Sequence, residues 1–150
     1  MENELALVRQ KKSMSVPEMG RLLGLKKTES YYLLHKGFFE STTIGNNMRV
    51  MVDSFEDWYR LALYCAQNGK CYVTGKPLVI GRIHCHHKTP LKYGGTDEYK
   101  NLVLIDEDVH KLIHAVKGNI VNKYVELLKP NYYHRDKINR YRKKLNLEPI

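Results

Sequence analysis

The sequence has few cysteines and no long apolar run. Its three cysteines (Cys65, Cys71 and Cys85) cannot all pair with one another, so a disulfide framework is not expected. No apolar run approaches the roughly 18 residues that a membrane helix needs. The acids Glu2 and Glu4, and the lack of an apolar stretch beside them, argue against a signal peptide. These absences predict a cytoplasmic protein without a membrane partner.

Repeats and low-complexity segments are also absent, and a hydrophobic share of 43% is normal for a folded protein. A length of 150 residues leaves room for one ordinary domain or two small ones. The net charge of +9 lies mainly in residues 71–150, which hold fifteen basic and eight acidic side chains. Residues 1–70 hold ten and eight. The basic half indicates a polyanionic partner, most simply a nucleic-acid backbone, although a solvated basic surface would have the same composition.

The stretch SVPEMGRLLGL predicts a short helix near the N-terminus. Ser15 can cap this helix, Glu18 can complete a capping box, and Gly24 ends it. A second helix follows in KTESYYLLHKG, with Thr28 as its cap and Gly37 as its stop. Two short helices joined by a tight glycine-containing turn are the outline of a helix-turn-helix.

The next stretch, FFESTTIGNNMRVMV, predicts two strands around a turn that begins at Gly45. A third helix is expected from a cap at Asp53 and Ser54 to Gly69. In this order the elements make a small winged module, and residues 15–62 resemble the excisionase-like DNA-binding domains of mobile elements. The resemblance is carried by VPEMGRLLGL, HKGFF, the hairpin with its arginine, and FEDWYR.

This resemblance implies a DNA-binding surface on the second helix and the wing. The residues expected to face a DNA groove are Lys26, Lys27, Thr28, Ser30 and Tyr31, with Arg49 on the wing contacting the backbone. DNA binding is the favoured interpretation. The alternative, a small protein-binding or purely structural domain, stays open because phosphate contacts need cations and this half has few to spare.

The strongest pattern is HCHHKTPLKYGGTDEYKNLVLIDEDVHKLIHA, which holds five of the seven histidines. His110 and His114 lie four residues apart in a helix that begins with three acids, so both imidazoles can face one metal ion. His86 and His87 are adjacent in a predicted strand and therefore point to opposite faces. One histidine of this pair is therefore free to transfer a proton while the other binds the metal. Metal-assisted hydrolysis requires both roles.

This segment resembles the HNH nucleases, whose ββα-metal fold places two strands and a helix around one divalent ion. It is similar in particular to the endonuclease domain of group II intron reverse transcriptase/maturase proteins, over roughly residues 60–150. The similarity lies in GKCYVTGKPL, the CHHKTPLKYGGTDEYKNLV core, DVHKLIHA, and the tail KYVELLK…INRYRKKL. The pattern HH-x13-N-x8-H-x3-H, with the GG and NL pairs inside it, is improbable by chance.

The resemblance implies a role for each residue of the pattern. His87 is the general base, and the Asn101 amide fixes the loop and orients the base or approaches the metal. His114 is a metal ligand or a contact to the scissile phosphate, with the ligand role preferred. His84 has no family role and is expected to be structural. The implied catalytic set is His87, Asn101 and His110, and the implied metal ligands are His86, His110 and His114.

The implied cofactor is one divalent metal ion. Imidazole ligands suit Zn, Ni, Mn or Co better than Mg, yet family members also work with Mg, so the choice among Mg, Mn, Zn and Ni stays open. Many relatives carry two Cys-x2-Cys pairs for a structural zinc, but here Thr74 and Val109 stand where cysteines are common. A structural zinc is therefore not expected. Apolar packing is expected to replace it, through Tyr72, Val73, Leu78 and Ile80.

From Ile113 onward the chain predicts helices, with a weak point at Gly118 and a break at Pro130. The final stretch RDKINRYRKKL alternates cations with apolar residues. It could follow a phosphate backbone or pack one face on the domain, and the sequence favours neither.

These expectations combine into an α+β protein of two modules, a winged helix-turn-helix in residues 1–62 and an HNH nuclease domain in residues 63–150. A continuous helix over 54–68 should hold the modules in a set geometry. The expected function is metal-dependent cleavage of DNA, nicking by the monomer in preference to double-strand cutting, for a mobile genetic element. The main alternative is a non-catalytic DNA-binding regulator that retains the scaffold, although the intact His/Asn/His triplet argues against it. Intron RNA is a second candidate partner.

Overall fold

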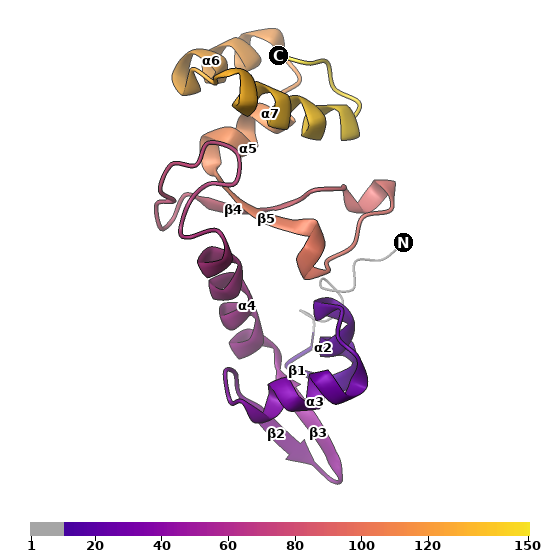
Figure 1. Cartoon of the computed structure of the whole chain (residues 1–150). Helices are drawn as coiled ribbons and strands as arrows, with labels where there is room; N and C mark the ends of the chain where they lie inside the picture. Colours follow the sequence, from indigo (N-terminus) through magenta and orange to yellow (C-terminus); the bar gives the residue numbers. More distant parts are fainter. Residues whose placement is uncertain (1–10) are drawn as a thin grey trace.

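The computed structural model describes residues 11–150, an α+β chain with six α-helices and two small antiparallel sheets (Figure 1). The two acids at the start of the sequence and the beginning of the predicted first module lie outside the described residues. Within residues 11–150, no helix has both the length and the apolar composition needed to cross a membrane.

The first part of the chain combines a three-stranded sheet with two short helices. Its elements are β1 (Ser13–Ser15), α2 (Val16–Leu23), α3 (Lys27–His35), β2 (Ser41–Ile44) and β3 (Asn47–Met51). The strand order is β1-β3-β2, with both neighbours antiparallel to β3. The hairpin turns at Gly45, as predicted, with a positive φ of 62°. Strand β1 was not expected from the sequence, and it pairs Met14 with Val50, which are both fully buried.

Helix α2 begins and ends as predicted. The Ser15 Oγ accepts a hydrogen bond from the Glu18 backbone N–H at 3.2 Å, and Gly24 closes the helix in the left-handed conformation. The Glu18 carboxylate does not return to the cap residue. It lies 3.4 Å from the Lys11 ammonium instead, so only the Ser15 half of the predicted capping box forms.

Helix α3 begins earlier than predicted. Lys26 is the N-cap residue, and the Glu29 carboxylate accepts from the Lys26 backbone N–H at 2.9 Å. The prediction that Thr28 caps this helix is therefore wrong. The cap is Lys26, two residues upstream, because the Glu29 carboxylate accepts a hydrogen bond from the Lys26 backbone N–H. Gly37 follows the end of the helix with a φ of 74°.

Helix α4 (Val52–Ala66) connects the two halves of the molecule (Figure 1). Its N-cap is Met51, and the expected cap Ser54 accepts from the Glu40 backbone N–H instead. Phe55, Tyr59 and Leu63 recur every four residues and are buried, so one face of the helix lies in the core. The buried side chains form one cluster from the first sheet through α4 to the last helices.

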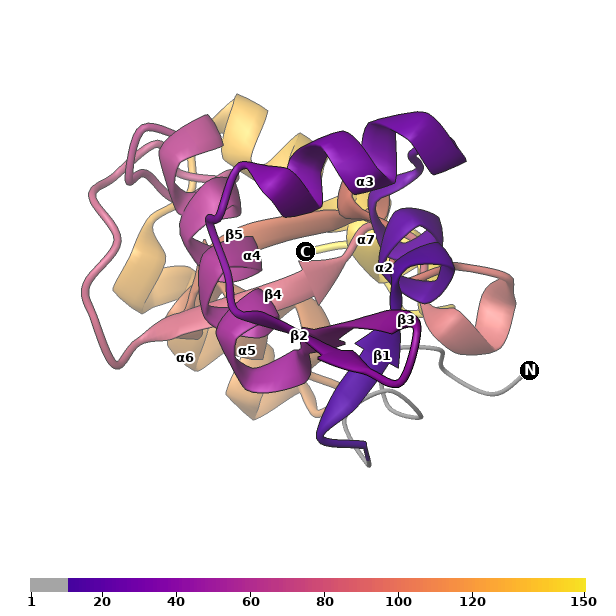
Figure 2. The ribbon, with the colours of Figure 1, turned by 90° about the horizontal axis from the view of Figure 1, so that it is seen from below.

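The second half contains a two-stranded sheet covered by helices (Figures 1 and 2). Its elements are β4 (Ile83–His87), β5 (Leu102–Asp106), α5 (Glu107–His114), α6 (Gly118–Leu128) and α7 (Tyr132–Lys144). The strands are antiparallel, with Ile83 opposite Asp106 and His87 opposite Leu102. Short 3-10 turns at Leu91–Tyr93 and Tyr99–Asn101 shape the loop between them. The chain extends at Ala115, so α5 and α6 are separate helices.

The segment before β4 packs only partly as expected. Val73 and Leu78 are buried, but Tyr72 is 38% exposed and Ile80 is 92% exposed. The prediction that all four apolar residues would pack here is therefore wrong for Tyr72 and Ile80. The chain leaves the core after Leu78 through an exposed turn at Gly81 before it enters β4.

Candidate active site

Three histidines from β4 and α5 converge at the centre of the second half. One ring nitrogen each of His86, His110 and His114 lies within 4.8 Å of the others. Strand pairing places His86 beside α5, and the four-residue spacing places His110 and His114 on the same helical face. The sequence-predicted ligand set is thus brought together in space.

Burial keeps these imidazoles neutral. Burial, together with the charge that neighbouring histidines would carry, lowers the pKa of His86 to about 3 and the pKa of His110 to about 4. Burial followed by the charge of Lys92 lowers the pKa of His114. Metal ions bind the neutral imidazole, so these three side chains are in the ligating state at neutral pH.

Neighbouring rings hold the ligands in place. His84 stacks on His110 with ring centroids 4.4 Å apart and planes 8° apart. Tyr141 of α7 packs edge-on against His86 at 4.8 Å. His84 therefore lies on the same face of β4 as His86 and supports His110 by stacking. The donor set, three neutral imidazoles with a common centre, fits one divalent ion.

His87 leaves the opposite face of β4 and has a different partner. Its Nε2 lies 2.7 Å from Oδ1 of Asp97, whose side chain is 2% exposed. A carboxylate can only accept a hydrogen bond, so Nε2 carries the hydrogen and the lone pair lies on Nδ1. The carboxylate thus fixes the tautomer of a half-buried imidazole that stands outside the three-histidine cluster.

Asn101 braces the loop between the strands. Its Oδ1 accepts from the Thr89 N–H at 2.9 Å, and its Nδ2 donates to the carbonyls of Thr89 at 3.0 Å and Thr96 at 2.7 Å. Its backbone carbonyl accepts from Lys88 at 2.7 Å. One side chain therefore ties both arms of the loop together, in the loop-fixing role expected from the sequence.

Helix α4 holds the far side of the same loop. The buried Tyr59 hydroxyl donates to the Asp97 carbonyl at 2.9 Å, and the Tyr99 hydroxyl donates to the Ala62 carbonyl at 3.3 Å. Close packing also requires Gly95, because a Cβ there would lie 1.8 Å from the Thr89 carbonyl oxygen. The carboxylate that contacts His87 is thus positioned by a helix from the first half of the chain.

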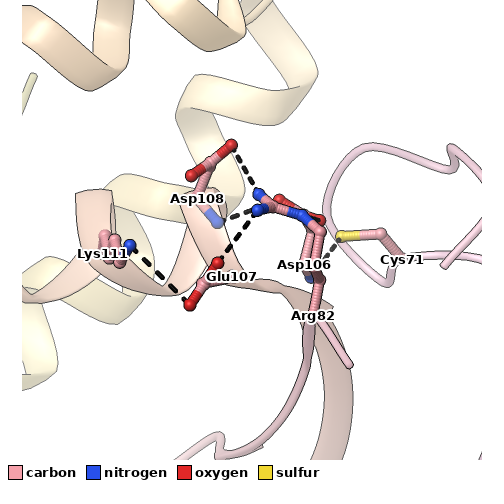
Figure 3. Close-up of polar contacts among 6 residues, drawn as sticks. All are labelled: Cys71, Arg82, Asp106, Glu107, Asp108 and Lys111. Carbon is pink, nitrogen blue, oxygen red and sulfur yellow. Dashed lines mark hydrogen bonds and ion pairs between the residues drawn. The ribbon is translucent and has the colours of Figure 1, made fainter. Parts of the chain in front are cut away.

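Arg82 and three carboxylates fix the start of α5 (Figure 3). The Arg82 guanidinium lies 3.7, 3.0 and 2.8 Å from the carboxylates of Asp106, Glu107 and Asp108, and these carboxylates raise its pKa. The Cys71 sulfur accepts from the Asp106 N–H at 3.5 Å. Arg82 therefore links the segment before β4 to the helix that carries two of the three clustered histidines.

Arg142 fixes the C-terminal end of α5. Its buried guanidinium donates to the carbonyls of Leu112 and Ala115, each at 2.8 Å, and to the Glu148 carbonyl at 2.7 Å. It satisfies carbonyls that the helix end leaves free and fastens α7 to α5.

The residues expected to face DNA are only partly on the surface. Lys26, Lys27 and Thr28 are exposed at the start of α3. Tyr31 and Arg49 are half-buried and line a groove of about 780 Å³ between the hairpin and the helices. Ser30 is a correction. It is 2% exposed, its hydroxyl donates to the Lys26 carbonyl, and it packs against Gly20, where α2 and α3 approach closely.

Sequence reasoning missed Asp97. It stands in a polar Gly-Gly-Thr-Asp stretch where an aspartate is ordinarily a turn residue. Its partner lies ten residues upstream in a strand, and no local periodicity indicates that pairing. Comparison with protein-family models, curated proteins and solved structures finds no match.

Proposed function

We propose that the chain is a metal-dependent DNA endonuclease of the HNH type, with β4, β5 and α5 as its ββα-metal core. The observation that carries the proposal is the division among the histidines. Three neutral imidazoles share one centre, and the fourth, His87, pairs with a buried carboxylate on the other face of the strand. A structural histidine cluster would not need a separate, tautomer-fixed imidazole beside it.

His87 is the general base in this proposal. Its Nδ1 takes a proton from water as the water oxygen attacks the phosphorus of a phosphodiester, and the bond from phosphorus to the 3′ oxygen breaks. Asp97 holds the ring and offsets the positive charge that the ring acquires with the proton. Asn101 keeps the loop, and with it Asp97, at a fixed position.

The cofactor is one divalent ion, held by His86, His110 and His114. It would supply Lewis-acid activation of the phosphate and stabilise the leaving oxygen. Mg, Mn, Zn and Ni are the candidates, and the three-nitrogen donor set favours the latter three.

The first half would act as a winged helix-turn-helix that binds DNA. Lys26, Lys27 and Thr28 extend from the start of α3, and Arg49 and Tyr31 line the groove beside the hairpin. Arg49 donates to the Ser13 hydroxyl at 3.3 Å and to the Ser13 carbonyl at 3.2 Å, which would orient its guanidinium at the edge of that groove.

The test is cleavage of supercoiled plasmid with Mg, Mn, Zn or Ni added, comparing the native protein with His87→Ala and His110→Ala. The expected result is nicked DNA from the native protein and none after chelation. His87→Ala should lower the rate by at least about a hundredfold, since a general base contributes roughly that much. His110→Ala should lower the rate by a similar factor, because it removes one of the three metal ligands. His35→Ala is the matched control, because His35 is exposed at the end of α3.

A gel-shift assay with duplex DNA separates the nuclease proposal from a DNA-binding regulator. If no metal supports cleavage while the native protein still shifts duplex DNA on a gel, the nuclease proposal fails. The chain would then act as a DNA-binding regulator.

A further inference from the structure

The cations of the second half divide into two groups by their partners. Arg82, Arg140, Lys100 and Lys111 each lie within 3.7 Å of a carboxylate oxygen. Eleven others have no carboxylate oxygen within 4.0 Å among residues 11–150. Four of these lie in the loop after β4 or contact that loop or Tyr72, and they are Lys88, Lys92, Lys137 and Lys144. Their positive charge is therefore available to an external anion.

Aromatic rings and neutral oxygens hold these four ammonium groups. Lys137 lies 4.7 Å from the centre of the Tyr72 ring and donates to the Tyr72 carbonyl at 3.0 Å, and Lys88 lies 5.6 Å from the same ring. Lys92 lies 5.1 Å from the Tyr93 ring. Such contacts orient a cation without neutralising its charge.

Three of the four lysines lie in or against the loop that follows His87. Lys88 follows His87 directly, and Lys92 lies at the turn that begins at Leu91. The Lys144 ammonium donates to the Thr89 hydroxyl at 3.3 Å, which joins the end of α7 to the start of the same loop.

Helix α7 carries core residues together with cations that reach neighbouring elements. Ile138 and Tyr141 are buried, whereas the Lys137 ammonium contacts Tyr72 and the Lys144 ammonium contacts the loop at Thr89. Seven residues of helix rise about 10.5 Å, which equals the axial rise of about three phosphates along one DNA strand. The seven-residue spacing of Lys137 and Lys144 therefore suits an anion with regularly spaced charges.

We propose that Lys88, Lys92, Lys137 and Lys144 form a phosphate track along α7 that holds the backbone of duplex DNA across the histidine cluster. The inference rests on the proposed nuclease function for its substrate. It assigns the second half its own DNA contact, separate from the surface of α3.

The experiment measures the affinity of the full chain for a duplex oligonucleotide over a series of KCl concentrations, with chelator present so that the DNA stays intact. The Lys137→Gln/Lys144→Gln variant should reduce the slope of log K against log salt by about 1.8, because each phosphate contact contributes about 0.9. Its affinity near 0.15 M salt should fall on the order of tenfold. The Lys137→Arg/Lys144→Arg variant should restore both values.

The matched control is Lys123→Gln/Lys129→Gln on α6 and its C-cap, which removes the same charge and includes a lysine 5.4 Å from a tyrosine ring. A slope for the α7 variant equal to that of the native protein, or of this control, overturns the inference. A loss confined to folded RNA of similar length, with duplex DNA unaffected, also overturns it. Cleavage is measured in a separate assay. A reduced slope in a protein that never cuts DNA would support the phosphate track and contradict the nuclease proposal.

Discussion

His84 and His87 illustrate how surroundings assign different tasks to the same side chain. His84 stacks flat on His110 and supports a ligand, whereas His87, three residues later on the opposite face, contacts a buried carboxylate. The role of His87 thus depends on Asp97, which offers an acceptor for one ring nitrogen and leaves the other free. Under the proposed function, Asp97 would be a positioning residue, since it would act through the imidazole.

Asp97→Asn should lower kcat for plasmid cleavage by about a hundredfold, the range of a general base that loses its orienting partner. The amide has nearly the same shape, so KM, affinity for duplex DNA and Tm should stay near native values. Steady-state kinetics and thermal unfolding check the prediction. A raised KM with unchanged kcat, or a large fall in Tm, would contradict a positioning role and indicate a purely structural one.

At the scale of the element, the loop over residues 88–101 determines the geometry of the site. Asn101 ties both of its arms together, and Gly95 lets the chain pass against the Thr89 backbone. The neighbouring Gly94 has a positive φ of 88° but open space around it. The two glycines are therefore required for different reasons, close packing in one case and backbone conformation in the other.

Gly95→Ala should destabilise the protein by about 2–3 kcal/mol, because a Cβ would overlap backbone atoms that cannot rotate away. It should also lower cleavage by more than about tenfold as the loop shifts. Gly94→Ala should cost only about 1 kcal/mol, from its left-handed conformation. Urea unfolding and cleavage rates measure both. Equal effects of the two substitutions would show that the close contact with Thr89 is unimportant.

Elements with a local cause were predictable. The Ser15 cap, the turn at Gly45 and the four-residue spacing of His110 and His114 depend on neighbours in sequence, and the structure has all three. What could not be predicted depends on partners distant in sequence. Strand β1 exists because Met14 pairs with Val50, and the burial of Ser30 follows from the approach of two helices. A three-residue strand carries no periodicity to detect.

At the scale of the whole molecule, a row of aromatic rings runs from the first sheet to the active-site loop. Phe39 packs on Phe55 at 5.3 Å, Phe55 on Tyr59 at 5.5 Å, and Tyr59 on Tyr99 at 5.8 Å. Two of these rings are also hydrogen-bonded, Tyr59 to the Asp97 carbonyl and Tyr99 to the Ala62 carbonyl. The halves of the chain share one core, so the position of the loop over residues 88–101 depends on the folding of the first half.

Tyr59→Phe should therefore affect the loop while leaving the ring contacts intact. The lost hydrogen bond to the Asp97 carbonyl should lower the free energy of unfolding by about 1 kcal/mol, or Tm by about 3 °C. Cleavage should fall severalfold while the salt dependence of DNA binding is unchanged. Tyr132→Phe on the exposed end of α7 is the control. A cleavage rate equal to that of the control would mean that α4 does not position Asp97.

The uninterrupted course of α4 has a consequence for where DNA would be cut. Fifteen residues of helix span about 22 Å, the rise of about six or seven base pairs. The loop over residues 88–101 contacts this helix at Tyr59 and Ala62. Under the proposed function, a duplex bound by both α3 and this loop would be cut at a constant offset from the bases that α3 contacts. The protein would then work as a molecular ruler, choosing its cleavage position by distance and not by the sequence at the scissile bond.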